Sequence, residues 1–303
     1  MTIFHLVLIR PSHYDSEGYV IQWLRSGIPS NTLAALNGLA KDCAERKILG
    51  NDVEIRVTPI DEANTKVDVE RLACMIERDG GHGLIGLAGV QTNQYPRALD
   101  IGRRCREKGL QVCIGGFHVS GILAMLPEPT PELNEATKLG ISLYAGESET
   151  RFDEVMLDAF NRKLKPLYNY LNDLPNVDGE PPPFMPVDRV YKTLSKVTSF
   201  DAGRGCPFVC SFCSIINVHG RKSRFRGPND VEWVIRANKA QGISRFFITA
   251  AGVGVIFGSR NRIFLCDISG WRHKPAPHAD RRERIGAGVG LCDAGKGVGV
   301  NLC

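Results

Sequence analysis

The sequence lacks the features of a membrane protein. A helix needs roughly 18 consecutive apolar residues to cross a bilayer. The longest apolar stretch, residues 246–258, is shorter and is interrupted by Gly252 and Gly254. Residues 1–9 form only a short apolar run before Arg10, which is typical of a buried strand and not of a signal peptide. We therefore expect no membrane span and a cytoplasmic protein.

The chain also has little net charge outside its last part. The formal charge is +5, but residues 251–303 alone hold eight Lys or Arg and four Asp or Glu. Residues 1–250 are thus nearly neutral, and we expect no nucleic acid as a partner. With 43% apolar and 23% charged residues, the composition is that of a globular protein. A small-molecule substrate is the expected partner.

A dinucleotide-binding fingerprint is missing as well. Residues 1–150 alternate apolar runs with amphipathic ones, which predicts an α/β domain with a doubly wound parallel sheet. The expected strands are 4–9, 53–60, 84–90, 111–114 and 141–145, and the expected helices are 31–49, 67–78, 95–108 and one after Glu149. Pro11-Ser12-His13 follows the first strand, where a NAD site needs Gly-x-Gly-x-x-Gly. NAD is therefore disfavoured.

The loops after the strands are where such a sheet binds its ligand. They include Gln91-Thr92-Asn93, Gly115-Gly116-Phe117-His118 and Gly146-Glu147-Ser148-Glu149. Paired glycines allow backbone to approach a bulky ligand without a Cβ in the way. We expect the ligand of the first domain at these loops.

Two further segments follow residues 1–150. Residues 151–190 are predicted to be a helix and a linker, because Leu171 to Pro186 contains five prolines among Asn, Asp and Gly. Residues 191–250 run through an apolar strand, a cysteine-containing loop, a helix starting at Pro228 and a strand at 246–249. This order predicts the start of a (β/α) partial TIM barrel.

Residues 251–303 have a different character. They contain ten glycines, and their apolar spacing fits neither a helix nor a strand for long. A TIM barrel takes about 250 residues and a six-unit version roughly 190, more than remain after Leu194. We expect that the chain left its proper reading frame near Ala250, giving a truncated product with a non-native tail. Reading the coding DNA in the other two frames tests this.

The chain has ten cysteines, which should be reduced thiols in the cytoplasm, so their clustering is the informative feature. Cys43, Cys74, Cys105 and Cys113 lie singly in helix or strand patterns. We expect these four to be small buried hydrophobic residues.

Three other cysteines form a cluster. Cys206, Cys210 and Cys213 have the spacing Cys-x3-Cys-x2-Cys. Three thiolates can bind a cuboidal 4Fe-4S cluster and leave its fourth iron without a protein ligand. The alternative is a structural zinc site with His219, six residues after Cys213, as fourth ligand.

The cluster resembles the signature of the radical S-adenosylmethionine superfamily, which has an aromatic residue before the last cysteine, here Phe212. The resemblance implies that the three cysteines bind the 4Fe-4S cluster and that Phe212 lies near the adenine of S-adenosylmethionine. In that family one electron from the cluster cleaves S-adenosylmethionine, and the resulting 5'-deoxyadenosyl radical abstracts a hydrogen atom. An electron donor such as flavodoxin or ferredoxin is also implied.

Residues 1–150 resemble the cobalamin-binding domain that is fused to many of these enzymes. The match rests on its Gly-Gly and Gly-Glu-x-Glu loops. The implied cofactor contacts are Thr92, Gly115, Gly116, His118, Gly146 and Glu147. The Asp-x-His-x-x-Gly motif that supplies a lower cobalt ligand in other cobalamin proteins is absent, and His13, although in the right loop, has the wrong spacing.

A basic segment, Arg221 to Arg226, follows the cysteines. Most such runs are solvated loops. The functional alternative is that one arginine pairs with a carboxylate of a substrate or cofactor, since a guanidinium forms a bidentate fork.

Together the resemblances imply a cobalamin-dependent radical S-adenosylmethionine enzyme, most simply a methyltransferase acting on an unreactive carbon. A related rearrangement or cyclisation would use the same parts. One alternative is a non-catalytic truncated product that only binds cofactor. Another is a methylthiotransferase, whose N-terminal domain would hold three further cluster-binding cysteines. No catalytic residue beyond the cluster is predicted.

Overall fold

The computed structural model describes residues 1–208, 210, 213–250, 253–256, 262–265 and 298–301. Phe212 and most of the segment 251–303 lie outside these residues, so the predictions made for them stay predictions. Within the described ranges, no helix is long and apolar enough to cross a membrane.

Six parallel strands form the first sheet, in the order β2-β1-β3-β4-β5-β6. They are β1 (Thr2–Arg10), β2 (Val53–Asp61), β3 (Gly83–Leu87), β4 (Gln111–Gly115), β5 (Ser142–Gly146) and β6 (Leu167–Tyr170). The five predicted strands are confirmed. The sixth, β6, was not predicted, because its four residues fall in a segment that was expected to be helix and linker.

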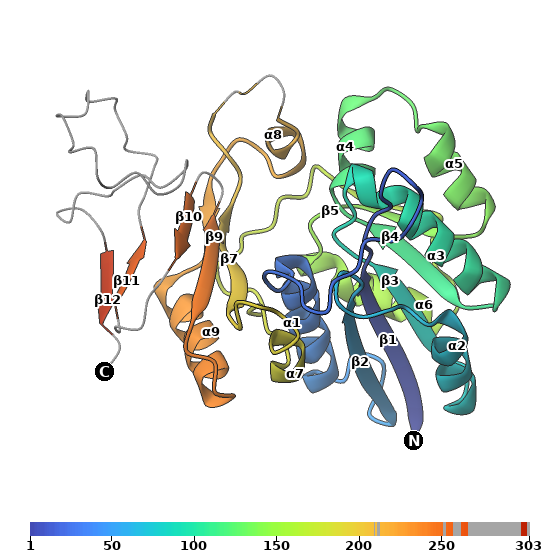
Figure 1. The fold of residues 1–303 in the computed structure, drawn as a ribbon, viewed down its shortest axis with the longest axis horizontal. Helices are drawn as coiled ribbons and strands as arrows, with labels where there is room; N and C mark the ends of the chain where they lie inside the picture. The colour runs from blue at the N-terminus through green and yellow to red at the C-terminus, as the bar shows by residue number, and fades with distance from the viewer. Residues whose placement is uncertain (209, 211–212, 251–252, 257–261, 266–297, 302–303) are drawn as a thin grey trace.

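Helices cover both faces of this sheet, as a doubly wound fold requires (Figure 1). One face carries α1 (Asn31–Glu45) and α6 (Phe152–Phe160), and the other carries α2 (Val69–Arg78), α3 (Tyr95–Glu107), α4 (Phe117–Met125) and α5 (Pro131–Lys138). Along β1, Leu6 and Leu8 pack on the first of these faces, whereas Val7 and Ile9 pack on the second. Burial on both sides explains why the strand is a continuous apolar run.

The helix boundaries follow local signals in part. Ser30 caps α1 as predicted, its Oγ accepting from the backbone N of Leu33 at 3.3 Å. The helix ends at Glu45, before the predicted Leu49, and Lys47 adopts a left-handed φ of 53°. The sequence did not predict α4 and α5, and Phe117 and His118, expected in a loop, begin α4.

A second sheet has the order β10-β9-β7-β8. In it, β7 (Thr198–Arg204) and β9 (Phe246–Ala250) are parallel and are joined through α9 (Pro228–Ala240). This β-α-β unit is the predicted start of the barrel. The strand β8 (Arg224–Phe225) pairs antiparallel with the end of β7, so residues 205–223, which we call the cysteine loop, connect two paired strands.

The later strands do not continue a barrel pattern. The strand β10 (Val253–Ile256) runs antiparallel to β9, where a barrel would continue with a helix and a parallel strand. Two further strands, β11 (Arg262–Leu265) and β12 (Val298–Asn301), pair with each other.

The two sheets face each other across α1. This helix lies between the six-stranded sheet and β7 (Figure 1). Its first residue, Asn31, donates from Nδ2 to Oγ1 of Thr249 in β9 at 2.7 Å. A short helix of the cysteine loop, α8 (Ile215–Val218), contacts α4. The loops at the carboxyl edge of the first sheet therefore lie beside the cysteine loop.

Candidate functional site

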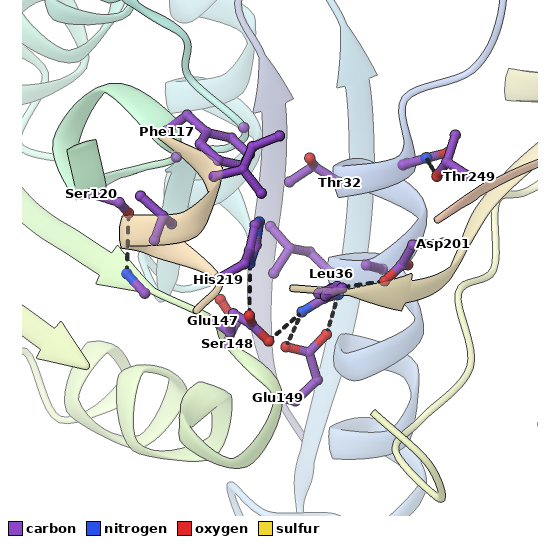
Figure 2. Close-up of a pocket in the computed structure, with 18 of the residues that line it drawn as sticks. Thr32, Leu36, Phe117, Ser120, Glu147, Ser148, Glu149, Asp201, His219 and Thr249 are labelled. Atoms are coloured by element: carbon purple, nitrogen blue, oxygen red, sulfur yellow. Dashed lines mark hydrogen bonds and ion pairs between the residues drawn. The ribbon is translucent and has the colours of Figure 1, made fainter. Parts of the chain in front are cut away.

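A cavity of about 350 Å³ lies between the two sheets. Its walls come from α1, from the loops that follow β3, β4 and β5, and from β7 and the cysteine loop (Figure 2). Thr32, Gly116, Glu147, Arg204 and His219 are among the residues that line it. The cavity is at the edge of the sheet where the sequence predicted a ligand.

A smaller cavity of about 130 Å³ adjoins it on the α1 and α6 face of the first sheet. Its walls are largely apolar and include Leu6, Leu8 and Tyr144, together with Gly86 and Gly115. Several residues line both cavities: Thr32, Leu36, Gly89, Gly116, Gly146 and Ser148. A ligand in the larger cavity could therefore extend a narrow apolar part into the smaller one.

Two glycines at this edge are required by close backbone approach. Gly116 has a φ of 145°, and a Cβ there would lie 2.2 Å from the backbone N of Val90. Gly146 has a φ of 105°, and its Cβ would lie 2.7 Å from the backbone of Tyr170. Neither position accommodates a side chain, because the backbone of Val90 and of Tyr170 occupies the space.

Glu147 is buried at the boundary between the first sheet and the cysteine loop. Its carboxylate lies 2.7 Å from Nδ1 of His219, and it accepts from Nη1 of Arg224 at 2.9 Å and from Nη1 of Arg204 at 3.1 Å. Burial alone would raise the pKa of Glu147, but the bonds from His219 and Arg224 and the charge of Arg204 lower it to about 2. The carboxylate is therefore charged at neutral pH.

Glu149 forms a second buried ion pair from the same loop. It accepts from Arg204 twice, at 2.8 Å and 2.6 Å. The Nε of Arg204 donates to Asp201 at 2.8 Å. Burial would raise the pKa of Asp201, but the charges of Arg204 and Arg226 outweigh it and lower that pKa. Three carboxylates and the guanidinium of Arg204 thus form one connected network.

The basic segment, Arg221 to Arg226, was interpreted as a solvated loop or as the source of an arginine that pairs with a substrate or cofactor carboxylate. As a whole it is neither. Arg224 is neither solvated nor available to an external carboxylate, because it pairs with Glu147. Arg226 is buried and donates to the backbone oxygens of Asp201, at 3.1 Å, and Val177, at 3.3 Å. Of its basic residues, only Arg221 and Lys222 are exposed, as a solvated run would be.

The three clustered cysteines lie in the cysteine loop just after β7. Their thiols are free, that of Cys210 is exposed and those of Cys206 and Cys213 are partly exposed. The backbone N of Cys206 donates to the oxygen of Gly220, and that of Cys213 donates to Cys210, each at 3.1 Å. The loop thus has internal hydrogen bonds at both ends of the cluster.

The described residues do not gather into a metal-binding group of side chains. In the described part of the chain, no group of three or more His, Cys, Asp or Glu side chains is arranged around one point to hold a metal ion. Nδ1 of His219 faces Glu147, and the zinc site stays an alternative prediction. A 4Fe-4S cluster binds its thiolates at three different irons, so they need not converge on one point. Cys206, Cys210 and Cys213 stay the predicted ligands of such a cluster.

Other predicted residues lie away from the cavities. Thr92 is exposed in a short helix, η1 (Thr92–Gln94), and lines neither cavity. His118 is buried, with its ring centroid 4.2 Å from that of Tyr95 and its Nε2 3.0 Å from Glu132. Burial lowers the pKa of His118. His13 is partly exposed and also lines neither cavity.

The isolated cysteines follow the prediction with one exception. Cys43, Cys105 and Cys113 are buried, whereas Cys74 is exposed on α2, so the expectation of burial was wrong for Cys74. Burial raises the pKa of Cys105 and of Cys113 to about 12. These thiols are protonated and inert at neutral pH.

Two curated methyltransferases of Chlorobaculum tepidum are similar to part of the chain. Bacteriochlorophyllide d C-12(1)-methyltransferase is 31% identical over 163 residues, covering 52% of this chain and 33% of that protein. Bacteriochlorophyllide d C-8(2)-methyltransferase is 28% identical over 214 residues, covering 64% of this chain and 44% of that protein. The chain therefore spans less than half the length of these relatives. No protein-family model matches it.

A solved structure shares the fold. It is TsrM from Kitasatospora setae, a radical S-adenosylmethionine methyltransferase with cobalamin and a [4Fe-4S] cluster bound. The TM-score is 0.54 at 14% identity, over 82% of this chain and 49% of that one. The likeness establishes the α/β architecture, with a parallel sheet followed by the beginning of a second unit, as the fold of this chain.

Proposed function

We propose that this chain is part of a cobalamin-dependent radical S-adenosylmethionine enzyme that transfers a methyl group to a small-molecule substrate. The observation that carries the proposal is the position of the cysteine loop. Gly205, just before Cys206, and Ile215, just after Cys213, both line the larger cavity at the carboxyl edge of the first sheet. A group bound by the three thiolates would therefore adjoin a ligand bound to the first sheet.

The relatives support methyl transfer as the reaction. Both curated proteins are named as methyltransferases of bacteriochlorophyllide d, and the solved structure with the same fold is named as a radical S-adenosylmethionine methyltransferase. A bacteriochlorophyllide is therefore the first substrate to assay.

Cys206, Cys210 and Cys213 would hold the 4Fe-4S cluster. When bound, it would supply the electron that cleaves S-adenosylmethionine. The accessible thiols and the internal hydrogen bonds of the loop support this assignment. Phe212 stays the predicted neighbour of the adenine, and a flavodoxin or ferredoxin the predicted electron donor.

The two adjoining cavities would hold cobalamin, which carries the methyl group when bound. The apolar walls of the smaller cavity, including Leu6, Leu8 and Tyr144, suit a nucleotide tail, and Gly115, Gly116 and Gly146 adjoin it. Thr92 and His118 would touch the cofactor only where it extends beyond these cavities. In the loop after β5, the charged carboxylate of Glu147 can accept a hydrogen bond from Nδ1 of His219 when that atom carries the proton.

The alternatives predict different products. Anaerobically reconstituted protein, given S-adenosylmethionine, hydroxocobalamin and a strong reductant, should form 5'-deoxyadenosine and retain cobalamin. Absence of 5'-deoxyadenosine would leave the non-catalytic, cofactor-binding product as the better account. A methylthiotransferase would contain a second cluster, yet Cys43, Cys105 and Cys113 are buried singly within helices and strands. Iron in excess of one cluster would favour it.

A further inference from the structure

The Gly-Glu-x-Glu loop has a role that does not require a ligand. We propose that Glu147 and Glu149 are positioning residues that hold the cysteine loop against the first sheet before any cluster binds. The inference deepens the proposed function, because it explains how the cluster would be placed beside the cavity. It can nevertheless be tested on the metal-free chain.

The contacts of the two carboxylates lie at both ends of the cysteine loop. Arg204, which precedes Cys206, pairs with Glu149 at 2.6 Å and with Glu147 at 3.1 Å. At the other end, His219 lies 2.7 Å from Glu147, and Arg224 donates to the same carboxylate at 2.9 Å. One short loop after β5 therefore contacts both ends of the cysteine loop, and Figure 2 shows its contact between Glu147 and His219.

The carboxylates of Glu147 and Glu149 are buried, which makes their ion pairs to the cysteine loop costly to break. Glu147 and Glu149 are each 4% exposed. A buried carboxylate without its partners is strongly unfavourable, so neither can turn toward a ligand without leaving cations unpaired. By contrast, Glu70 and Arg104 form an ion pair with side chains 58% and 44% exposed, and exposed pairs contribute little. Glu70 thus offers a matched control.

The segments joined by these contacts are otherwise far apart in the chain. Glu149 and Arg204 are separated by 55 positions, and Glu147 and Arg224 by 77. Among the described residues between β7 and β8, the four-residue helix α8 is the one regular element. The pairing of β7 with β8 holds the two ends of the loop beside each other, and the ion pairs connect those ends to the first sheet.

Hydrogen exchange on the full-length, metal-free, reduced chain tests the proposal. In Glu147→Gln, which removes the charge but keeps the shape, we expect amides of residues 205–223 to exchange about tenfold faster or more. Amides of β1 and β3 should keep their wild-type rates, and Glu70→Gln should leave the cysteine loop unchanged. Wild-type exchange of the loop in Glu147→Gln, or equal acceleration in Glu70→Gln, would overturn the proposal.

A milder variant covers the case in which Glu147→Gln loses protection throughout β1 and β3. Arg224→Lys keeps the charge but loses the guanidinium fork. It should accelerate exchange several-fold within residues 205–223 alone. An unchanged loop in this variant would also overturn the proposal.

A spectroscopic measurement separates positioning from folding. After anaerobic reconstitution, Glu147→Gln should take up as much iron as wild type, but its reduced cluster should give a shifted EPR spectrum, because the thiols are held differently. An unchanged spectrum would contradict the positioning role. If wild type takes up no iron, the proposed function fails, and the exchange data still decide this inference.

Discussion

A buried carboxylate stays charged only while its hydrogen-bond donors remain in place. Glu147 meets this condition through His219, Arg204 and Arg224, each of which comes from the second unit of the fold. The sequence motif marked Glu147 as a contact of a cofactor, and the structure surrounds it with protein donors. At the scale of the residue, its chemistry is that of an internal ion pair.

The pH dependence of stability should report this ion pair. The pKa of Glu147 is lowered from 4.5 to about 2, so its contribution to stability is complete above 4.5 and is lost as the pH falls through about 2. We expect wild type to lose up to about 3 kcal/mol through this group over that range. Glu147→Gln cannot ionise, so its unfolding free energy should fall less steeply. Urea unfolding at a series of acidic pH values measures both, and identical slopes would contradict the assignment.

At the scale of elements, the turn from β4 into α4 forms part of the wall of the larger cavity. Gly116 has φ 145° and ψ −170°, a region that is essentially restricted to glycine. The backbone N of His118 donates to the oxygen of Val90 at 3.0 Å, which ties this turn to the loop after β3. The turn therefore depends on glycine at this position.

Replacing Gly116 by alanine should disrupt that turn. The new Cβ would lie 2.2 Å from a backbone atom of Val90, and we expect a loss of about 2 kcal/mol or more in unfolding free energy. Gly121, also in α4, has no atom within 4 Å of its Cβ position. Gly121→Ala should be neutral or stabilising by about 0.5 kcal/mol, as in other helix interiors. Denaturant unfolding compares the two, and equal stabilities would contradict the argument.

The elements that the sequence predicted share a local signal. The strand β1 was predicted from a continuous apolar run, and α1 from Ser30 and its periodicity. By contrast, α4 is apolar on most sides, which leaves no helical period to detect. The strand β6 is only four residues long and becomes a strand by pairing with β5.

The candidate site residues also divide into those that have a local signal in the sequence and those that do not. The cysteines are recognisable because their spacing is local in the chain. The pairing of Glu149 with Arg204 links positions 55 residues apart, and only the packing of the two units determines it. The sequence shows acidic residues in the Gly-Glu-x-Glu loop and basic residues in the segment Arg221 to Arg226, but nothing in it indicates that they pair.

At the scale of the whole molecule, the cavity between the two units is the place where cofactor and cluster would meet. Ala35 lies on α1 and lines this cavity. We expect Ala35→Trp to weaken retention of hydroxocobalamin at least about tenfold, because an indole would occupy part of a 350 Å³ cavity.

A matched variant controls for the added indole. Ala240 is exposed in the last turn of α9 and lines neither cavity. Ala240→Trp should therefore retain cobalamin as wild type does. An ultraviolet-visible titration measures both variants, and wild-type retention in Ala35→Trp would remove the cavity from the proposed cofactor site.

Iron and sulfide analysis after anaerobic reconstitution tests the central claim most directly. We expect about four irons and four sulfides per wild-type chain, as one 4Fe-4S cluster requires. Cys210→Ala should lose most of both, whereas Cys74→Ala, which removes another exposed free thiol, on α2, should keep them. No iron in the wild-type chain, or iron that survives in Cys210→Ala, would contradict the account.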